Sequence, residues 1–315
     1  MRSLARLAER PAALGSTWAV VRTLVATSSL LTLLANHPAS IDALAADLAG
    51  REACRGVARV TAACVLTAGE YTWGTHVVLV VCFLAVASGV LPRVTGLIHP
   101  LAALSLMTSL TTADGGDQAA LVFSVLAVPL CLADPRRSHW APWPEEETAS
   151  ERAVLRRSTV TVFTLVLRLQ ISLIYLEAGL AKLAVHEWAE GTALYYWTID
   201  GYLPPPTFAE PLVGLIATTP LLLLGATYGT LVLELLLGVS LLLRPARLRA
   251  ALLATALLFH LVIALTFAIW SFALTMAALV TFLLSPTRFA DWRPLVRGAA
   301  AQRPVPPAGL PAVTR

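Results

Sequence analysis

Ionisable side chains within long apolar runs of the sequence need partners for their charges. Among these residues, Lys182, Glu234 and His260 could carry chemistry. A lysine in an apolar site can act as a base, because desolvation disfavours the ammonium form. Ionisable residues inside a membrane also mark functional sites. The residues therefore predict a buried pocket with Lys182 as the base and Glu234 and His260 as its catalytic partners.

Each of these side chains also has a purely structural explanation. Lys182 lies near the end of its apolar run, so its stem can lie along apolar surface while the ammonium group reaches the membrane interface. Glu234 can form an ion pair with Arg168, and His260 can be a hydrogen-bonded packing residue. The residues alone leave both explanations open.

The apolar run that contains Lys182 places several polar residues on one face of a helix. At about 100° per residue, Arg168, Tyr175, Gly179 and Lys182 share that face, whereas Glu177 lies well off it. A helix over this run would present the four residues to one neighbouring element.

Two other motifs lie at the edges of the apolar runs. Asp114 and Asp117 flank a Gly-Gly pair directly before such a run. Carboxylates in this position typically cap a helix N-terminus. Cys54 and Cys64 lie in a stretch that we expect outside the membrane, where a disulfide can form, although two free thiols fit the pattern equally well.

The composition predicts the elements that must position these residues. Of the 315 residues, 57% are hydrophobic and 13% are charged, whereas soluble domains contain about 25% charged residues. Apolar runs of nearly spanning length lie near 17–36, 75–91, 94–110, 118–132, 159–183, 220–243, 249–267 and 269–285. The predicted fold class is all-α, a polytopic transmembrane helical bundle of about eight spans.

The arginine distribution predicts the orientation. Clusters precede the first run and follow the fourth, sixth and eighth, so all of them lie on one side if there are eight spans. By the positive-inside rule, both termini are cytoplasmic. Residues 1–297 then form the transmembrane domain, with 37–74 as an external excursion containing a short interfacial helix, and 185–211 as an external loop that lies along the interface. Residues 298–315 form a disordered cytoplasmic tail.

Several function classes find no support. The sequence has no P-loop, no dinucleotide-binding glycines and no nucleophile elbow. Its four cysteines lack metal-ligand spacing, so no metal site is expected. The net charge of +4 does not indicate nucleic-acid binding. The expected location is the cell membrane, as a multi-pass protein in contact with lipid.

The polar residues follow the order of a known family motif. The sequence resembles the HTTM (horizontally transferred transmembrane) domain shared with vitamin K-dependent γ-glutamyl carboxylase, in Gln170, Tyr175, Gly179, Lys182-Leu183, Trp188 and Gly191, followed by Glu234, Phe259-His260 and Trp270. It is most similar to the sporulation-delaying protein B subgroup, through Arg22, Asp114-Gly-Gly-Asp117, Asp134-Pro-Arg136 and His139.

The resemblance implies a chemistry. In the carboxylase, the lysine that matches Lys182 deprotonates reduced vitamin K, so menaquinone or a vitamin K hydroquinone is the implied cofactor. The sporulation-delaying subgroup is tied to the production of exported toxic peptides. The implied pocket consists of the three catalytic candidates and of the lining residues Arg168, Gln170, Tyr175, Asp117, Trp188 and Trp270.

Two departures limit the transfer. Asp117 stands where the carboxylase has a histidine, and the large substrate-binding domain of the carboxylase has no counterpart in the chain. We therefore expect a quinol-linked enzyme that modifies or matures an exported antimicrobial peptide together with a partner protein. The alternative is a non-catalytic membrane factor for export of, or immunity to, such a peptide. A transporter is less favoured, because the sequence shows no inverted repeat.

Overall fold

The computed structural model describes residues 14–41, 54, 56–110, 113–144, 150–199 and 204–291. Within these ranges the regular structure is helical, and the one β-bridge pairs Val90 with Ser138. The predicted all-α fold class is therefore confirmed. The N-terminal arginines and the tail 298–315 lie outside the described residues.

Each of the eight apolar runs forms a helix. They are α2 (Ser16–Ala35), α6 (Trp73–Ser88), α7 (Pro92–Ser109), α8 (Gly115–Ala133), α9 (Glu151–Leu183), α13 (Pro220–Gly238), α14 (Ala246–Phe267) and α15 (Trp270–Leu284). Among them α2, α8, α9, α13 and α14 are long and apolar enough to cross a membrane, and α6 and α15 are shorter apolar helices. The chain is thus a helical membrane bundle.

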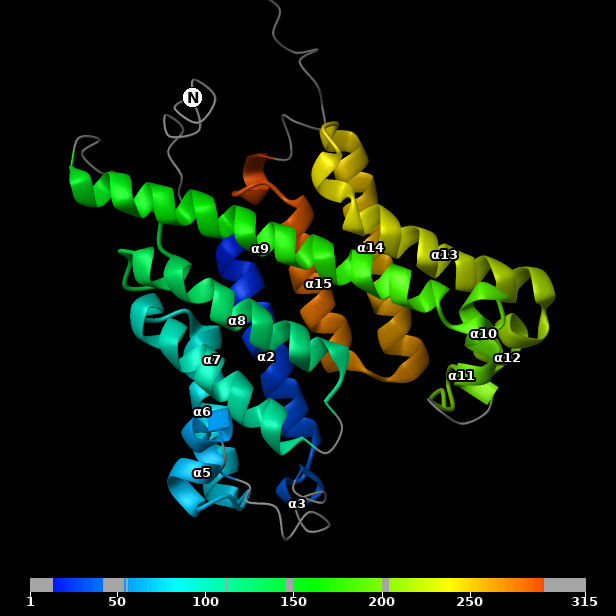
Figure 1. The fold of residues 1–315 in the computed structure, drawn as a ribbon, viewed down its shortest axis with the longest axis horizontal. Helices are drawn as coiled ribbons and strands as arrows, with labels where there is room; N and C mark the ends of the chain where they lie inside the picture. The colour runs from blue at the N-terminus through cyan, green and yellow to red at the C-terminus, as the bar shows by residue number, and fades with distance from the viewer. Residues whose placement is uncertain are drawn as a thin grey trace, which may run out of the picture.

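The bundle has two large hydrophobic cores that share α2, and a small third cluster of Trp188, Ala193 and Leu231. One core joins α2 to α8, α9, α13, α14 and α15, and the other joins α2 to α6 and α7. Figure 1 shows α9 running alongside α8 and crossing α15 obliquely, with α13 running beside the C-terminal half of α9. The helices alternate in direction. One end of the bundle therefore contains the C-terminal ends of α2, α7, α9 and α14 and the N-terminal ends of α6, α8, α13 and α15.

The two ends of the bundle meet. The Thr17 hydroxyl donates a hydrogen bond to the Pro286 carbonyl at 2.6 Å. The backbone N–H of Phe289 donates to the Ser16 hydroxyl at 3.2 Å. The start of α2 and the end of α15 therefore lie side by side, as expected if both termini face the same side of the membrane.

The predicted division of the last long apolar stretch is confirmed. Helix α14 ends at Phe267, and Ala268 adopts a left-handed conformation with φ of 57°. Such a conformation ends a helix. Helix α15 then starts at Trp270 and returns through the bundle.

Helix α9 is longer than its apolar run. It starts at Glu151, where the Ser150 hydroxyl accepts a hydrogen bond from the backbone N–H of Ala153 at 3.2 Å. Its 33 residues span about 50 Å, which exceeds the hydrocarbon thickness of about 30 Å. The first turns, which contain Arg152 and Arg156, therefore extend beyond the apolar part.

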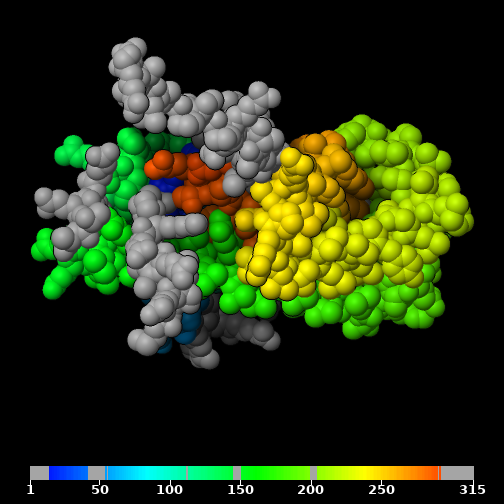
Figure 2. Space-filling model, turned by 90° about the horizontal axis from the view of Figure 1, so that it is seen from above, coloured from blue at the N-terminus to red at the C-terminus, as the bar shows by residue number. Residues whose placement is uncertain are grey.

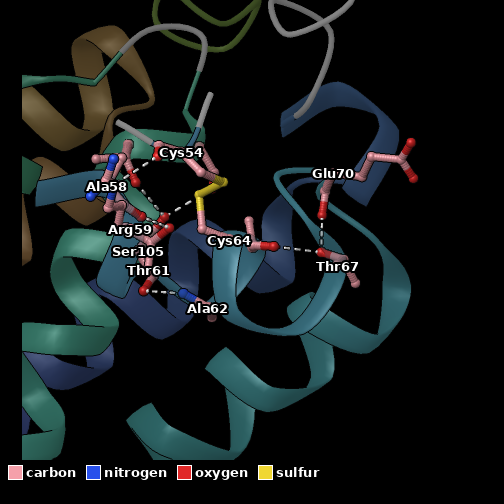
Figure 3. Close-up of a disulfide and its surroundings, with 12 residues drawn as sticks. Cys54, Ala58, Arg59, Thr61, Ala62, Cys64, Thr67, Glu70 and Ser105 are labelled. Carbon is pink, nitrogen blue, oxygen red and sulfur yellow. Dashed lines mark hydrogen bonds between the residues drawn. A yellow bond between two sulfur atoms is a disulfide. The ribbon is translucent and has the colours of Figure 1, made fainter. Parts of the chain in front are cut away.

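The excursion after α2 contains short helical pieces, namely α3 (Pro38–Ile41), η1 (Gly56–Val60) and α5 (Ala62–Thr67). Cys54 and Cys64 form a disulfide with a Cα–Cα distance of 5.6 Å (Figure 3). The backbone N–H of Ala62 donates to the Ser105 hydroxyl at 2.9 Å, which ties α5 to the end of α7. The disulfide alternative is thus confirmed, whereas the interfacial position of this segment stays a prediction.

The connection between α9 and α13 is also helical. It contains α10 (His186–Ala189), α11 (Ala193–Ile199) and α12 (Glu210–Thr218). In the space-filling view from above, this connection (yellow-green) forms one end of the long axis beside α13 (yellow) (Figure 2). The described residues of 185–211 are thus partly helical, whereas the position of this loop along the interface stays a prediction.

Candidate functional site

A cavity of about 670 Å³ lies where α9 ends and α8 begins. Its wall is formed by the end of α9, by α10, α11, α12, α13 and α14, and by the first residues of α8 and α15, and most of the lining is apolar. The ionisable residues of the lining are Asp114, Lys182 and Glu234. Since α8 begins and α9 ends at the end of the bundle that carries the disulfide, the cavity lies at this same end.

Lys182 and Glu234 form an ion pair on the cavity wall. The Lys182 Nζ lies 2.8 Å from Glu234 Oε1 and 2.9 Å from Oε2. It also lies 5.4 Å from the centre of the Trp188 ring, within cation–π range. The side chains are 24% and 10% exposed, respectively. The structure therefore places Lys182 against Glu234 rather than extended toward the interface, and each charge has a partner.

Close packing of α9 on α13 sets this pairing. A Cβ atom on Gly238 would lie 2.9 Å from Leu176 Cα, and one on Gly179 would lie 3.0 Å from a Leu235 methyl group. The Ser172 hydroxyl donates to the Gly238 carbonyl. Two glycines thus let the antiparallel helices approach closely enough for Glu234 to meet Lys182.

Tyr175 and His260 form a second pair behind the cavity. The Tyr175 hydroxyl lies 2.9 Å from His260 Nε2, and both side chains are buried. Neither residue belongs to the cavity lining, although Phe259 next to His260 does. The predicted contact of His260 with the lysine site is thus replaced by a hydrogen bond to Tyr175. His260 follows Phe259 by one residue, and the rotation of about 100° turns it from the cavity into the helix interface.

Arg168 lies away from the cavity and does not pair with Glu234. It donates to the backbone carbonyls of Phe282 at 3.2 Å and Ser285 at 2.7 Å, at the C-terminus of α15. A cation is favourable at a helix C-terminus, where carbonyl groups lack partners. The alternative of an Arg168–Glu234 ion pair is wrong, because the 14 residues from Arg168 to Lys182 correspond to about 21 Å along the helix.

Of the other predicted lining residues, only Trp188 lines the cavity. Gln170 is half-buried on α9, and Trp270 is 46% exposed at the start of α15. Asp117 instead completes a capping box at the start of α8. Asp114 accepts from the backbone N–H of Gly116 at 2.7 Å and of Asp117 at 3.0 Å, which confirms the capping interpretation.

The subgroup residues other than Asp114 to Asp117, which lie at the cavity end, form a separate buried cluster at the opposite end of the bundle. Arg22, fully buried on α2, lies 3.1 Å from His139 Nδ1 and donates to the Thr95 hydroxyl at 2.7 Å. Asp134 and Arg136 form a buried ion pair at 2.7 Å. These contacts tie α2, α7 and the connection after α8 together, which is a structural role.

Sequence reasoning missed most of the cavity wall. Its apolar and small residues on α11, α12 and α13 carry no chemical signal, so only the folded contacts reveal them. Trp197 belongs to the segment 185–211, which the sequence predicts as a loop along the interface. In the structure it lines the cavity together with Trp188. No pattern at the level of single helices could have shown that these elements meet.

Within the described residues, a helical bundle with five helices long and apolar enough to cross a membrane defines the chain as a multi-pass membrane protein. The model of the HTTM domain matches residues 121–292, and the chain belongs to this family. The matched part contains Lys182, Glu234 and His260.

Two curated relatives, both from Bacillus subtilis (strain 168), match most of the chain. The sporulation-delaying protein SdpB is 32% identical over 280 residues, which are 87% of this chain and 82% of SdpB. The uncharacterized protein YitO is 31% identical over 274 residues, 85% of each chain. No solved structure matches.

Proposed function

We propose that this protein is a cell-membrane enzyme that modifies or matures an exported peptide, with Lys182 and Glu234 as its proton-transferring pair. The observation that carries the proposal is the ion pair on the wall of the apolar cavity. An ion pair in apolar surroundings is costly compared with apolar residues of the same volume. A functional role explains why it is placed beside open space.

The pair can move a proton without creating net charge. Transfer of one proton from the Lys182 ammonium group to the Glu234 carboxylate leaves a neutral amine and a carboxylic acid, across 2.8 Å. The amine can then accept a proton from a substrate group in the cavity and become an ammonium group again. The resulting substrate anion lies beside this positive charge, which stabilises it.

The lining fits the quinol that the family resemblance implies. Its volume of about 670 Å³ lies in the range of small-molecule sites. Trp188, Trp197 and Phe272 would hold a flat apolar ring, and Lys182 would hold a polar oxygen at its edge. When bound, a menaquinol or vitamin K hydroquinone supplies two electrons and two hydroxyl protons.

The location of the cavity supports an exported substrate. It lies at the end of the bundle that carries the Cys54–Cys64 disulfide, and disulfides persist in oxidising compartments. A relative bears a name linked to delayed sporulation, in keeping with a role in producing a secreted peptide. A partner protein would supply the recognition of the peptide.

The test uses a deletion strain of the host, complemented by variants, with peptides in the culture medium compared by mass spectrometry. We expect Lys182→Ala, Lys182→Arg and Glu234→Gln to abolish the peptide differences that the wild type restores. Glu177→Gln is the matched control, because Glu177 is an exposed carboxylate on α9 outside the lining. Protein abundance and thermal unfolding in detergent establish that each variant folds.

Extraction in mild detergent, with mass spectrometry of bound lipids, tests the cofactor. Menaquinone that copurifies with the wild type and is lost in folded Lys182→Ala supports the quinol-linked reaction. Full function of Lys182→Arg would overturn the enzymatic proposal, because arginine keeps the charge but cannot act as a base. That outcome would favour the non-catalytic export or immunity factor.

A further inference from the structure

Three glycines lie on α13, and only one of them is explained by packing within the chain. A helix-interior glycine costs about 1 kcal/mol relative to alanine. Gly238 is needed for the approach of α9, since a Cβ atom there would lie 2.9 Å from Leu176 Cα. A Cβ atom on Gly225 or Gly229 would have no atom within 4 Å. Nothing in the described part of the chain makes contact where their side chains would be.

Both of these glycines line the cavity, and they continue toward the ion pair. Gly225, Ala226, Gly229 and Thr230 all belong to the lining and recur at helical spacing, and Glu234 follows Thr230 by four residues. From Gly225 to Glu234 the helix rises by about 14 Å. We call these four residues the small-residue wall. It forms a surface without large side chains that extends along α13 from Gly225 to the Lys182–Glu234 pair.

We propose that the small-residue wall is the surface against which the main chain of the peptide substrate lies, and that Gly225 and Gly229 determine which substrates are admitted. This inference rests on the proposed function and assigns the substrate to one wall of its cavity. The substrate class is an extended apolar peptide segment, with the group to be modified placed at Lys182 and Glu234.

Two features favour a peptide main chain over a lipid tail. Glycine lets another backbone approach closely, because it has no Cβ. The wall and the facing α11 also supply hydroxyl groups. Thr230 donates to the Ala226 carbonyl at 2.9 Å and Thr198 donates to the Leu194 carbonyl at 2.6 Å, and each hydroxyl oxygen keeps lone pairs that can accept from a peptide N–H. A lipid tail would use none of these acceptors.

The test is a size series at Gly225 and Gly229, with alanine and leucine at each position. Gly214 on α12 provides the matched control, because a Cβ atom there also has no neighbour within 4 Å while the residue lies outside the lining. The readouts are the peptide differences in the culture medium, copurified menaquinone, and thermal unfolding of each purified variant.

We expect a graded loss of the peptide products. Filling a site that the substrate needs hinders its binding, so Gly229→Leu lowers the products by about five- to a hundredfold. Gly229→Ala lowers them less, and Gly214→Leu leaves them unchanged. The alanine variants keep the test informative if a leucine variant fails to fold, because alanine favours the helix.

Distinct outcomes separate this inference from the proposed function. If Lys182→Ala is inactive but every folded member of the series is active, the small-residue wall does not contact the substrate. Loss of menaquinone together with the peptide products would assign the wall to the cofactor and also overturn the inference. Equal losses in Gly229→Leu and Gly214→Leu would do the same. Activity of Lys182→Ala, Lys182→Arg and Glu234→Gln would instead remove the proposed function.

Discussion

At the scale of single residues, the sequence identified the chemical groups but not their partners. Lys182, Glu234 and His260 were apparent as ionisable residues in apolar runs, and Asp114 was apparent as a cap. Whether Glu234 would meet Lys182 or Arg168 depends on how α9 and α13 slide past each other. The relative position of the two helices is set by contacts at Gly179 and Gly238. The spacing of residues within one helix does not encode these contacts.

His139 gives a pH prediction at this scale. Burial, and then the charges of Arg22 and Arg136, lower its pKa to about 3. Arg22 donates to Nδ1, so the neutral ring carries its proton on Nε2, which lies 3.2 Å from the Thr23 hydroxyl. Protonation of Nδ1 would break the contact with Arg22 and add a second buried positive charge.

The lowered pKa means that the unfolded chain binds this proton more tightly than the folded protein. The contribution of His139 to the free energy of unfolding is therefore complete above about pH 6.5, which is the pKa of histidine in the unfolded chain. This contribution falls as the pH drops toward about 3. We expect a loss of roughly 2 kcal/mol between about pH 6.5 and pH 5. The measurement is thermal unfolding in detergent against pH. A curve for His139→Gln as steep as that of the wild type would contradict the assignment.

At the scale of elements, helix positions followed from hydropathy but helix ends did not. All eight apolar runs are helical, because apolar runs of this length must satisfy their backbone hydrogen bonds internally in a membrane. Helix α9 starts eight residues before the predicted 159, since its arginines favour helix but interrupt the apolar run. Helix α13 ends at Gly238 rather than at the predicted residue 243. The short η2 helix (Ser240–Leu242) follows it.

The two kinds of glycine on α13 predict opposite effects on stability. Gly238→Ala would place a Cβ atom 2.8 Å from Leu176 Cβ, so it should destabilise the protein by about 1–3 kcal/mol. Gly225→Ala enters open space and should stabilise α13 by up to about 1 kcal/mol. Thermal unfolding of both purified variants tests this. Similar shifts of the two would show that α9 does not pack on Gly238.

At the scale of the whole molecule, the arginine distribution and the disulfide both predict the same orientation. The clusters at 136–137 and 244–249 lie at the end opposite to Cys54–Cys64. What the sequence could not supply is the cavity, because its wall combines residues from distant parts of the chain, such as Asp114, Trp197 and Phe272. Such a surface exists only after all these helices have packed.

Labelling of engineered cysteines tests the orientation. Glu70→Cys lies in the excursion and Trp140→Cys lies in the connection after α8, and both side chains are exposed. We expect a membrane-impermeant maleimide to label Glu70→Cys in intact cells and Trp140→Cys only after lysis. The parent protein, with half-buried Cys82 and buried Cys131, gives the background. The reverse labelling pattern would place the disulfide end in the cytoplasm.

The hydrogen bonds that join Thr17 to Pro286 and Ser16 to Phe289 hold the start of α2 beside the end of α15, so the first and last of the eight long helices are neighbours. Linking these neighbouring ends and opening the chain at another connection would leave every helix–helix contact available. The order in which the helices are synthesised is therefore separable from the way they pack, and a circularly permuted chain could encode the same cavity.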